Sequence, residues 1–172
     1  MTFRHMQVTR DAATAAPHGR VELLLVCSSG GHLLQLHALR PAWEGFNRAW
    51  VTFDKSDARS LLAGERVWFG HGPTNRNVRN LLRNVVLAWR LVGVARPRVV
   101  LSTGAGLAVP FVWIGRLRGA RVVYVESLTR IDEPSLSLRL LRPVASRVYV
   151  QWPELATRVS GARYVGGLFM ER

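Results

Sequence analysis

Two glycine-containing loops and one carboxylate are the groups in this sequence best suited to chemistry. The first loop, Ser28-Ser29-Gly30-Gly31-His32, directly follows the apolar run Val21–Cys27. Glycines such as Gly30 and Gly31 let the backbone approach a ligand closely, and the exposed N–H groups of such a loop suit an anion. His32 adds an imidazole, the most frequent general base in enzymes. The same residues also fit an ordinary turn in which the histidine caps or packs against the next helix.

The second loop is Ser102-Thr103-Gly104-Ala105-Gly106, at the end of a short apolar segment. It resembles half of a dinucleotide-binding fingerprint, but Val109 stands where the third glycine is required. We therefore expect Thr103, Gly104 and Gly106 to hold a phosphate or a sugar hydroxyl rather than NAD. A plain tight turn without a ligand is the alternative.

Glu126 is the first acidic residue after the stretch Arg66–Val125, which contains ten arginines and no Asp or Glu. A carboxylate directly after an apolar segment could orient a histidine or bind a sugar hydroxyl, and a salt bridge to Arg130 is the alternative. The histidines lack the spacing of a zinc site and there is no cysteine pair, so we expect no bound metal. The single cysteine, Cys27, is expected in a buried strand end.

Apolar segments of strand length alternate with helical patterns along the chain. Strands are expected over 21–27, 49–53, 66–69, 99–102, 121–125 and 147–150, and helices over 32–39, 55–63, 75–95, 107–117, 135–141 and 153–159. Strands that are apolar on both faces and are separated by helices indicate a parallel sheet. The fold class is therefore α/β, a Rossmann-like domain over residues 20–172 preceded by a loose tail at 1–19. Since ligands bind at the carboxyl ends of parallel strands, both glycine loops and Glu126 are expected at one edge of the sheet.

Positive charge is the strongest feature of the composition. The 172 residues include 24 basic and 11 acidic ones, giving a formal net charge of +13, and Lys55 is the only lysine. A GC-rich coding bias accounts for the preference for arginine but not for the acid-free stretch. Such a surplus calls for an anionic partner: a nucleic acid, a membrane surface or a phosphorylated substrate. We expect no nucleic acid, because no RNA- or DNA-binding motif is present.

The helix expected over 75–95 carries two stripes of side chains. Its apolar stripe consists of Val78, Leu81, Leu82, Val85, Trp89 and Val92, and its basic stripe of Arg76, Arg79, Arg83 and Arg90. One interpretation is an ordinary surface helix whose apolar stripe packs on the sheet. In the other, Trp89 and the four arginines face anionic lipid. No apolar stretch reaches the roughly 18 to 20 residues of a membrane span and no signal peptide is recognisable. We therefore expect a cytoplasmic protein that associates peripherally with the inner face of the plasma membrane.

Three segments of the C-terminal half resemble a known family. They are Tyr124-Val125-Glu126-Ser127-Leu128-Thr129-Arg130, Pro134-Ser135-Leu136-Ser137 and Val150-Gln151-Trp152-Pro153-Glu154-Leu155. Together with the two glycine loops they resemble the ALG-fourteen-like oligosaccharide-biosynthesis family, which includes PssD-type exopolysaccharide proteins, over residues 21–169. Such proteins are similar to the N-terminal, acceptor-binding half of MurG-like GT-B glycosyltransferases, with the donor-binding half on a separate polypeptide. Eukaryotic members carry an N-terminal membrane anchor, for which this sequence has no candidate.

The resemblance implies an acceptor-binding, membrane-associated subunit of an inverting two-component UDP-sugar glycosyltransferase, inactive without its donor-binding partner. The acceptor would be a polyprenyl-diphosphate-linked sugar in exopolysaccharide or lipid-linked oligosaccharide synthesis. His32 would be the general base, and Glu126 would orient it or bind the acceptor hydroxyl. Acceptor and phosphate binding would involve Ser29, Gly30, Gly31, Thr103, Gly104, Gly106, Ser127 and Arg130, and the partner interface Trp152 and Pro153. No cofactor or metal is implied beyond the UDP-sugar, which the partner binds. The alternative function is a non-catalytic scaffold or enhancer that recruits the donor-binding subunit to the membrane.

Overall fold

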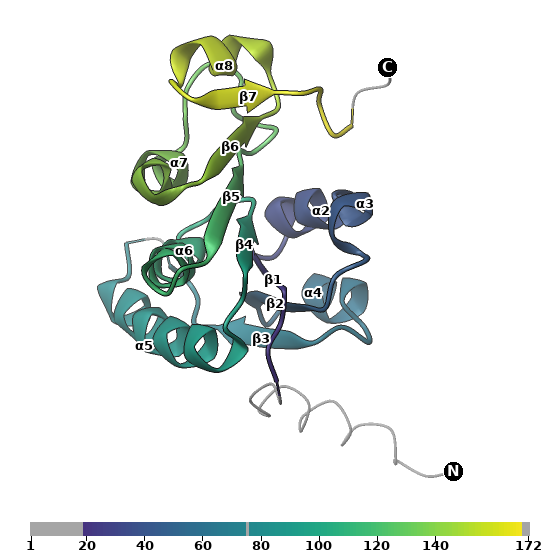
Figure 1. The fold of residues 1–172 in the computed structure, drawn as a ribbon, viewed down its shortest axis with the longest axis vertical. Helices are drawn as coiled ribbons and strands as arrows, with labels where there is room; N and C mark the ends of the chain where they lie inside the picture. Colours follow the sequence, from purple (N-terminus) through teal and green to yellow (C-terminus); the bar gives the residue numbers. More distant parts are fainter. Residues whose placement is uncertain (1–18, 75, 170–172) are drawn as a thin grey trace.

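The computed structural model of this protein describes residues 19–74 and 76–169, which form a seven-stranded sheet with helices on both faces (Figure 1). The strands are β1 (Leu23–Val26), β2 (Arg48–Phe53), β3 (Val67–Gly70), β4 (Val99–Ser102), β5 (Arg121–Val125), β6 (Arg147–Val150) and β7 (Ala162–Tyr164). Their order across the sheet is β3-β2-β1-β4-β5-β6-β7, and every neighbouring pair is parallel. The predicted Rossmann-like α/β fold is confirmed. The tail predicted at 1–19 lies, apart from Gly19, outside the described residues.

All six helices expected from the sequence are present, and one more is added. The helices are α2 (Gly31–Ala38), α3 (Arg40–Trp43), α4 (Ser56–Leu61), α5 (Val78–Ala95), α6 (Ala108–Leu117), α7 (Leu136–Leu141) and α8 (Pro153–Arg158), with a 3₁₀ turn at Arg142–Val144. The additional helix is α3, because Pro41 stands in its first turn and begins a helix there rather than only ending the preceding one. Strand β7 is also absent from the prediction, since it is three residues long and largely exposed.

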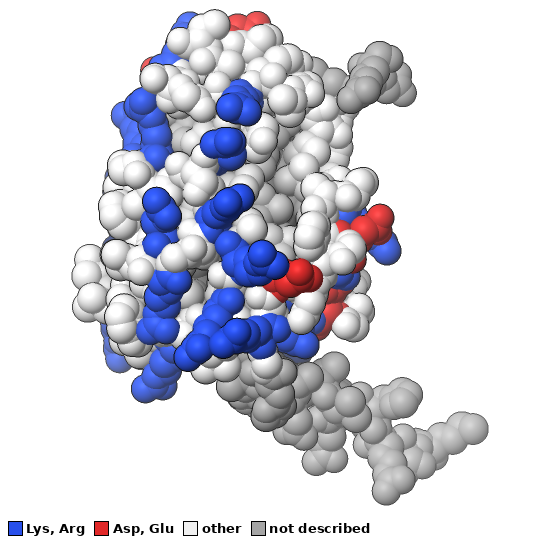
Figure 2. Space-filling view, in the orientation of Figure 1, with Lys and Arg blue, Asp and Glu red and all other residues white. Residues whose placement is uncertain are grey.

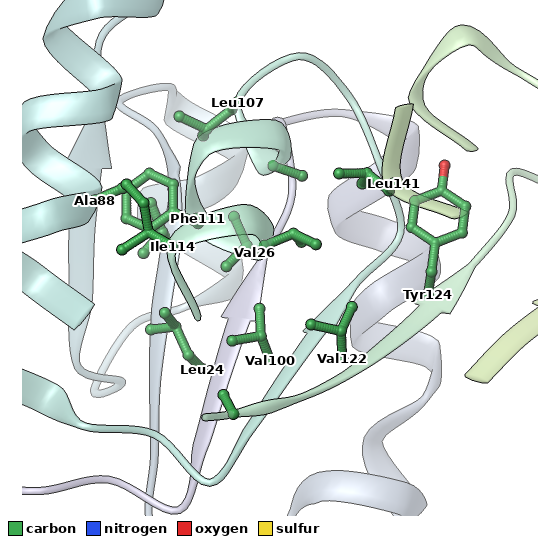
Figure 3. Packing of buried hydrophobic residues seen from close by; sticks show 14 of the residues in the cluster. Leu24, Val26, Ala88, Val100, Leu107, Phe111, Ile114, Val122, Tyr124 and Leu141 are labelled. Carbon is green, nitrogen blue, oxygen red and sulfur yellow. The ribbon is translucent and has the colours of Figure 1, made fainter. Parts of the chain in front are cut away.

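Side chains of the central strands alternate between two cores, one on each face of the sheet. Leu24 and Val26 of β1 pack in the core beneath α5, α6 and α7, which Figure 3 shows from close by. Leu23 and Leu25 point to the second core, which contains Trp43 of α3 and lies on the side of α2, α3 and α4 (Figure 1). Because successive residues of a strand face opposite sides and helices cover both sides, β1 is apolar throughout.

Strand β1 is the point at which the strand order reverses. The chain runs from β1 to β2 and β3 on one side, then returns to β4 on the other side of β1. Helix α2, after β1, and helix α6, after β4, pack on opposite faces of the sheet. Such a reversal leaves a crevice between the two loops, where ligands bind in open α/β sheets. The two glycine loops follow β1 and β4, so the fold brings them together as predicted.

Helix α5 packs on the domain with a different face from the one that its apolar pattern suggests. Its buried residues are Asn80, Asn84, Ala88, Leu91, Val92 and Ala95. In contrast, the side chains of Val78, Leu82 and Trp89 are 68%, 61% and 57% exposed. The interpretation of the apolar stripe as a packing face is therefore wrong, and Val92 is the one stripe residue that is buried.

Candidate active site

The carboxyl ends of β1 and β4 open into a cleft of about 1590 Å³. Among its polar lining residues are Ser28, His32, Asp54, Lys55, Thr74, Arg76 and Arg130. Its apolar lining residues include Val78 and Leu81 of α5 and Leu136 and Leu140 of α7. The cleft thus combines an imidazole, three cationic side chains and an apolar wall, which suits a ligand with an anionic part and an apolar part.

His32 stands in the first turn of α2, half-buried, and its ring is held by the second glycine loop. Its Nδ1 lies 2.8 Å from the carbonyl oxygen of Thr103. A carbonyl oxygen only accepts hydrogen bonds, so Nδ1 carries the proton and Nε2 of the neutral ring is left as an acceptor. The hydroxyl of Thr103 donates in return to the carbonyl oxygen of His32, at 2.8 Å. The two bonds fix the tautomer and the position of the imidazole, which is what a general base requires.

Gly104 and Gly106 are required by close contacts within the protein. Gly104 has a φ of +108°, which favours glycine, and a Cβ there would lie 2.7 Å from the hydroxyl oxygen of Tyr124. A Cβ on Gly106 would lie 2.9 Å from Oγ1 of Thr74. The two glycines therefore let neighbouring side chains pack against this loop, while their contact with a ligand stays a prediction.

The first glycine loop is partly occupied by a side chain of the protein itself. The N–H group of Gly30 donates to Oδ2 of Asp57, in the first turn of α4, at 2.6 Å. Ser29 is half-buried, and Gly30 and Gly31 are exposed. Because a carboxylate already binds the N–H of Gly30, this group is not free for the acceptor phosphate that the sequence interpretation assigned to it.

Glu126 is fully buried at the end of β5, and both of its carboxylate oxygens accept hydrogen bonds. Oε1 accepts from the backbone N–H of Ser127 at 2.8 Å and from the hydroxyl of Tyr124 at 3.3 Å. Oε2 accepts from the backbone N–H and the hydroxyl of Ser135, at 3.0 and 2.9 Å. Burial raises the pKa of Tyr124 and the charge of Glu126 raises it further, so the phenol stays protonated and donates. Glu126 therefore joins the end of β5 to the start of α7.

No hydrogen bond joins Glu126 to His32 among the described residues, so the orienting role predicted for Glu126 has no contact behind it, and its binding of the acceptor hydroxyl stays a prediction. The Nδ1 nitrogen of His32, which an orienting carboxylate would bind, is bonded to the carbonyl oxygen of Thr103 instead. A salt bridge between Glu126 and Arg130 is also absent from the described residues. Arg130 is exposed and lines the cleft, and Ser127 lies at the start of the same loop with its Oγ 3.0 Å from Oγ1 of Thr129.

The loop after β5 is held from two further sides. The buried side chain of Gln35 donates to the carbonyl oxygen of Glu126 at 2.7 Å and accepts from the backbone N–H of Leu128 at 3.2 Å. The indole N–H of Trp152 donates to the carbonyl oxygen of Leu128 at 2.7 Å. Trp152 thus supports the fold of this chain, and Pro153 is exposed at the start of α8. Contact of these two residues with a partner stays a prediction.

Basic and apolar side chains share the exposed face of α5. Arg79, Arg83 and Arg90 are exposed on this helix together with Trp89. The guanidinium carbon of Arg118, just after α6, lies 4.3 Å from the centre of the Trp89 ring. Figure 2 shows basic side chains spread over the side of the molecule where α5, α6 and α7 lie, with uncharged ones between them. Both α5 and α6 fall within the acid-free stretch, so neither helix adds a negative charge to this surface.

Polar cleft residues that the sequence-based acceptor site lacks include Lys55 after β2, and Thr74 and Arg76 after β3. The sequence interpretation places Arg76 on the basic stripe of the helix, and this is wrong. The helix begins only at Val78, and Arg76 has a left-handed φ of 50° in the preceding loop. The sequence signal that could have found this loop is the turn-forming pair Gly72-Pro73 followed by polar residues.

None of the helices in the described parts of the chain is both long and apolar enough to cross a membrane. Within residues 19–74 and 76–169, no three His, Cys, Asp or Glu side chains come together as a metal ion would require.

The fold and the position of the cleft define a Rossmann-like α/β domain. MurG of Acinetobacter baumannii superposes on this chain with a TM-score of 0.69 at 17% identity, over 85% of this chain and 46% of MurG. UDP-N-acetylglucosamine 2-epimerase of Rickettsia bellii superposes with a TM-score of 0.66 at 9% identity, over 87% of this chain and 45% of the epimerase. At these identities the likeness concerns the fold alone.

The chain belongs to the family of Alg14-like oligosaccharide biosynthesis proteins, whose family model matches residues 71–168. The UDP-N-acetylglucosamine transferase subunit ALG14 of Eremothecium gossypii is 40% identical over 120 residues, which are 63% of this chain and 52% of that protein. The protein of the same name from Yarrowia lipolytica is 35% identical over 180 residues, covering 87% of this chain and 82% of its own length. The chain thus spans about half the length of the Eremothecium relative and of MurG.

Proposed function

We propose that this chain is the acceptor-binding subunit of a two-component glycosyltransferase that transfers a sugar from a UDP-sugar to a polyprenyl-diphosphate-linked acceptor. Its relatives are named UDP-N-acetylglucosamine transferase subunits, so UDP-N-acetylglucosamine is the donor to test first. The observation that carries the proposal is the position of His32. Its ring lies in the cleft at the strand-order reversal, with Nδ1 bonded to Thr103 and Nε2 left as the acceptor.

The reaction that fits this geometry is an inverting displacement. Nε2 of His32 takes the proton from the acceptor hydroxyl as its oxygen forms a bond to the anomeric carbon of the donor sugar. The bond between that carbon and the diphosphate of UDP breaks on the opposite side, and UDP leaves. The chain supplies the acceptor site and the base, and the partner supplies the site for the UDP-sugar.

The exposed face of α5 supports a peripheral association with an anionic membrane. Leu82 and Trp89 provide apolar surface, and Arg79, Arg83 and Arg90 provide positive charge on the same helix. An interfacial helix combines apolar burial with attraction to anionic lipid, to which each basic residue contributes about 1 kcal/mol. Leu81 of α5 also lines the cleft, so the apolar surface continues from this helix into the site.

The open half of the sheet supports a docking surface for the donor-binding subunit. Parallel sheets are normally covered on both faces. On the face opposite α5, α6 and α7, a groove of about 1110 Å³ runs along β4, β5 and β6. Val123 and Tyr149 lie in its floor, and Val165, which is 71% exposed, lies at its side. Because relatives of the chain are named transferase subunits, we assign this groove to the donor-binding subunit, and Val165→Asp should reduce copurification with it.

The proposal is tested by reconstitution. The donor-binding subunit is first identified by its copurification with this chain and is then purified separately. Each protein alone and the mixture of the two are given UDP-N-acetylglucosamine and a farnesyl-diphosphate-linked sugar. Transfer by the mixture and by neither protein alone supports the proposal. Full transfer by the donor-binding subunit without this chain would contradict it and favour the non-catalytic scaffold.

A further inference from the structure

Two buried amides of α5, Asn80 and Asn84, bind the backbone of the loop that follows β3, at Pro73 and His71. Asn84 accepts from the backbone N–H of His71 and donates to its carbonyl oxygen, both at 2.8 Å. Asn80 donates to the carbonyl oxygen of Pro73 at 2.9 Å. The side chain of Asn77 caps the helix by accepting from the backbone N–H of Asn80 at 3.0 Å. Helix α5 therefore turns polar side chains inward, in place of its apolar stripe, to hold this loop.

The loop that follows β3 packs against the second glycine loop at the mouth of the cleft. Thr74 is so close to Gly106 that a Cβ on this glycine would lie 2.9 Å from Thr74 Oγ1. Arg76 follows in the left-handed region with a φ of 50°, a conformation that persists in a non-glycine residue only when its surroundings impose it. Its side chain lines the cleft together with those of His32 and Arg130.

Charged side chains make one part of the cleft attractive to an anion and another part repulsive. In the attractive part, Arg76 and Arg130 form no salt bridge with the described residues. Asp54 also lines the cleft, but Arg59 binds both of its carboxylate oxygens, at 2.5 and 2.8 Å. At the first glycine loop, the carboxylate of Asp57 occupies the N–H group of Gly30. An anionic group is therefore favoured beside Arg76 and repelled from Gly30.

We propose that Arg76, which lines the cleft together with Gly106 of the second glycine loop, binds the diphosphate of the acceptor rather than the membrane surface. The inference rests on the proposed function for the identity of the ligand and adds the residue and the place at which its diphosphate is recognised. A guanidinium binds phosphate oxygens through paired N–H groups, and no salt bridge with the described residues competes for that of Arg76.

The test uses binding of farnesyl diphosphate and of inorganic pyrophosphate to the full chain by calorimetry, alongside flotation with vesicles of neutral and anionic phospholipid. Arg76→Gln should weaken binding of both diphosphates by about tenfold or more, since a charge-assisted hydrogen bond is lost, and should leave vesicle flotation unchanged. Arg76→Lys should recover part of the affinity. Arg83→Gln should do the reverse, with flotation reduced by about fivefold and diphosphate binding unchanged. Arg163→Gln, on the exposed β7, is the matched control for both measurements.

Equal affinity of the wild type and Arg76→Gln for farnesyl diphosphate would overturn the inference, as would a loss of vesicle flotation in Arg76→Gln. Failure of the wild type to bind either diphosphate would overturn it as well. These outcomes are separate from those of the proposed function. A chain that binds diphosphate through Arg76 but supports no sugar transfer with its partner would contradict only the proposed function.

Discussion

Ser135 donates both its backbone N–H and its hydroxyl to a single oxygen of Glu126, at 3.0 and 2.9 Å. Its Oγ also accepts from the backbone N–H of Leu138 at 3.0 Å and so caps α7. The carboxylate that ends β5 is therefore the anchor of the helix that lines one side of the cleft. This relationship makes Glu126 a residue that positions α7.

Removal of this anchor should destabilise the domain. Glu126→Ala leaves four buried or half-buried donors without their acceptor, and we expect the free energy of unfolding to fall by about 2–4 kcal/mol. Ser135→Ala, which removes the cap and one bond to Glu126, should cost about 1–2 kcal/mol. Urea denaturation followed by circular dichroism measures both. Ser160→Ala, at an exposed serine, is the control and should stay within about 0.5 kcal/mol of the wild type. A Glu126→Ala protein as stable as this control would show that the network contributes nothing.

The exposed apolar residues of α5 should matter for membranes and not for folding. Leu82 and Val86 are 61% and 53% exposed, so changing both to Ser should alter the free energy of unfolding by less than about 1 kcal/mol. The same double variant should bind anionic vesicles about tenfold more weakly, because two apolar side chains no longer enter the lipid. Leu34→Ser is the matched control, since Leu34 is 56% exposed on α2, on the other face of the sheet. Equal vesicle binding by the double variant and the control would contradict the assignment of this surface.

Cys27 should be unreactive in the folded protein. Burial raises the pKa of its thiol from 9.0 to about 12. At pH 8.5 iodoacetamide should therefore modify the native chain far more slowly than the chain in urea, because the thiolate is the reactive form. Above pH 9 the unfolded thiol ionises and the folded one does not. The contribution of Cys27 to the free energy of unfolding should then decrease by about 1.4 kcal/mol per pH unit up to about pH 12. Equal alkylation rates with and without urea would contradict the buried position.

Much of the fold follows from the sequence because the strands are apolar on both faces. Runs such as Val21–Cys27, bounded by glycines and alternating with helical patterns, indicate a covered parallel sheet, and the glycines at their ends mark the loops that meet at the strand-order reversal. Strand β7 and helix α3 are not predicted from the sequence because they are too short. They are three and four residues long, and segments of this length carry no periodicity to detect.

The candidate site is predicted only in part, because several of its contacts join residues far apart in the chain. The glycine loops and His32 are recognisable from local pattern, whereas the bond between His32 and Thr103 spans 71 residues. The face of α5 is mistaken for the same reason. Asn84 is buried because it bonds to the backbone of His71, and a hydropathy pattern treats such an amide as solvent-exposed.

The central claim is tested most directly by the turnover number of the reconstituted pair with His32→Gln. We expect turnover to decrease by about 10²- to 10⁴-fold, with an acceptor KM within about threefold of the wild type, since the base acts in the transition state. His37→Gln, at a second histidine of the same helix that lies outside the cleft, should keep turnover within about twofold. Near wild-type turnover of a folded His32→Gln protein in the complex would contradict the account and leave this chain as a non-catalytic subunit.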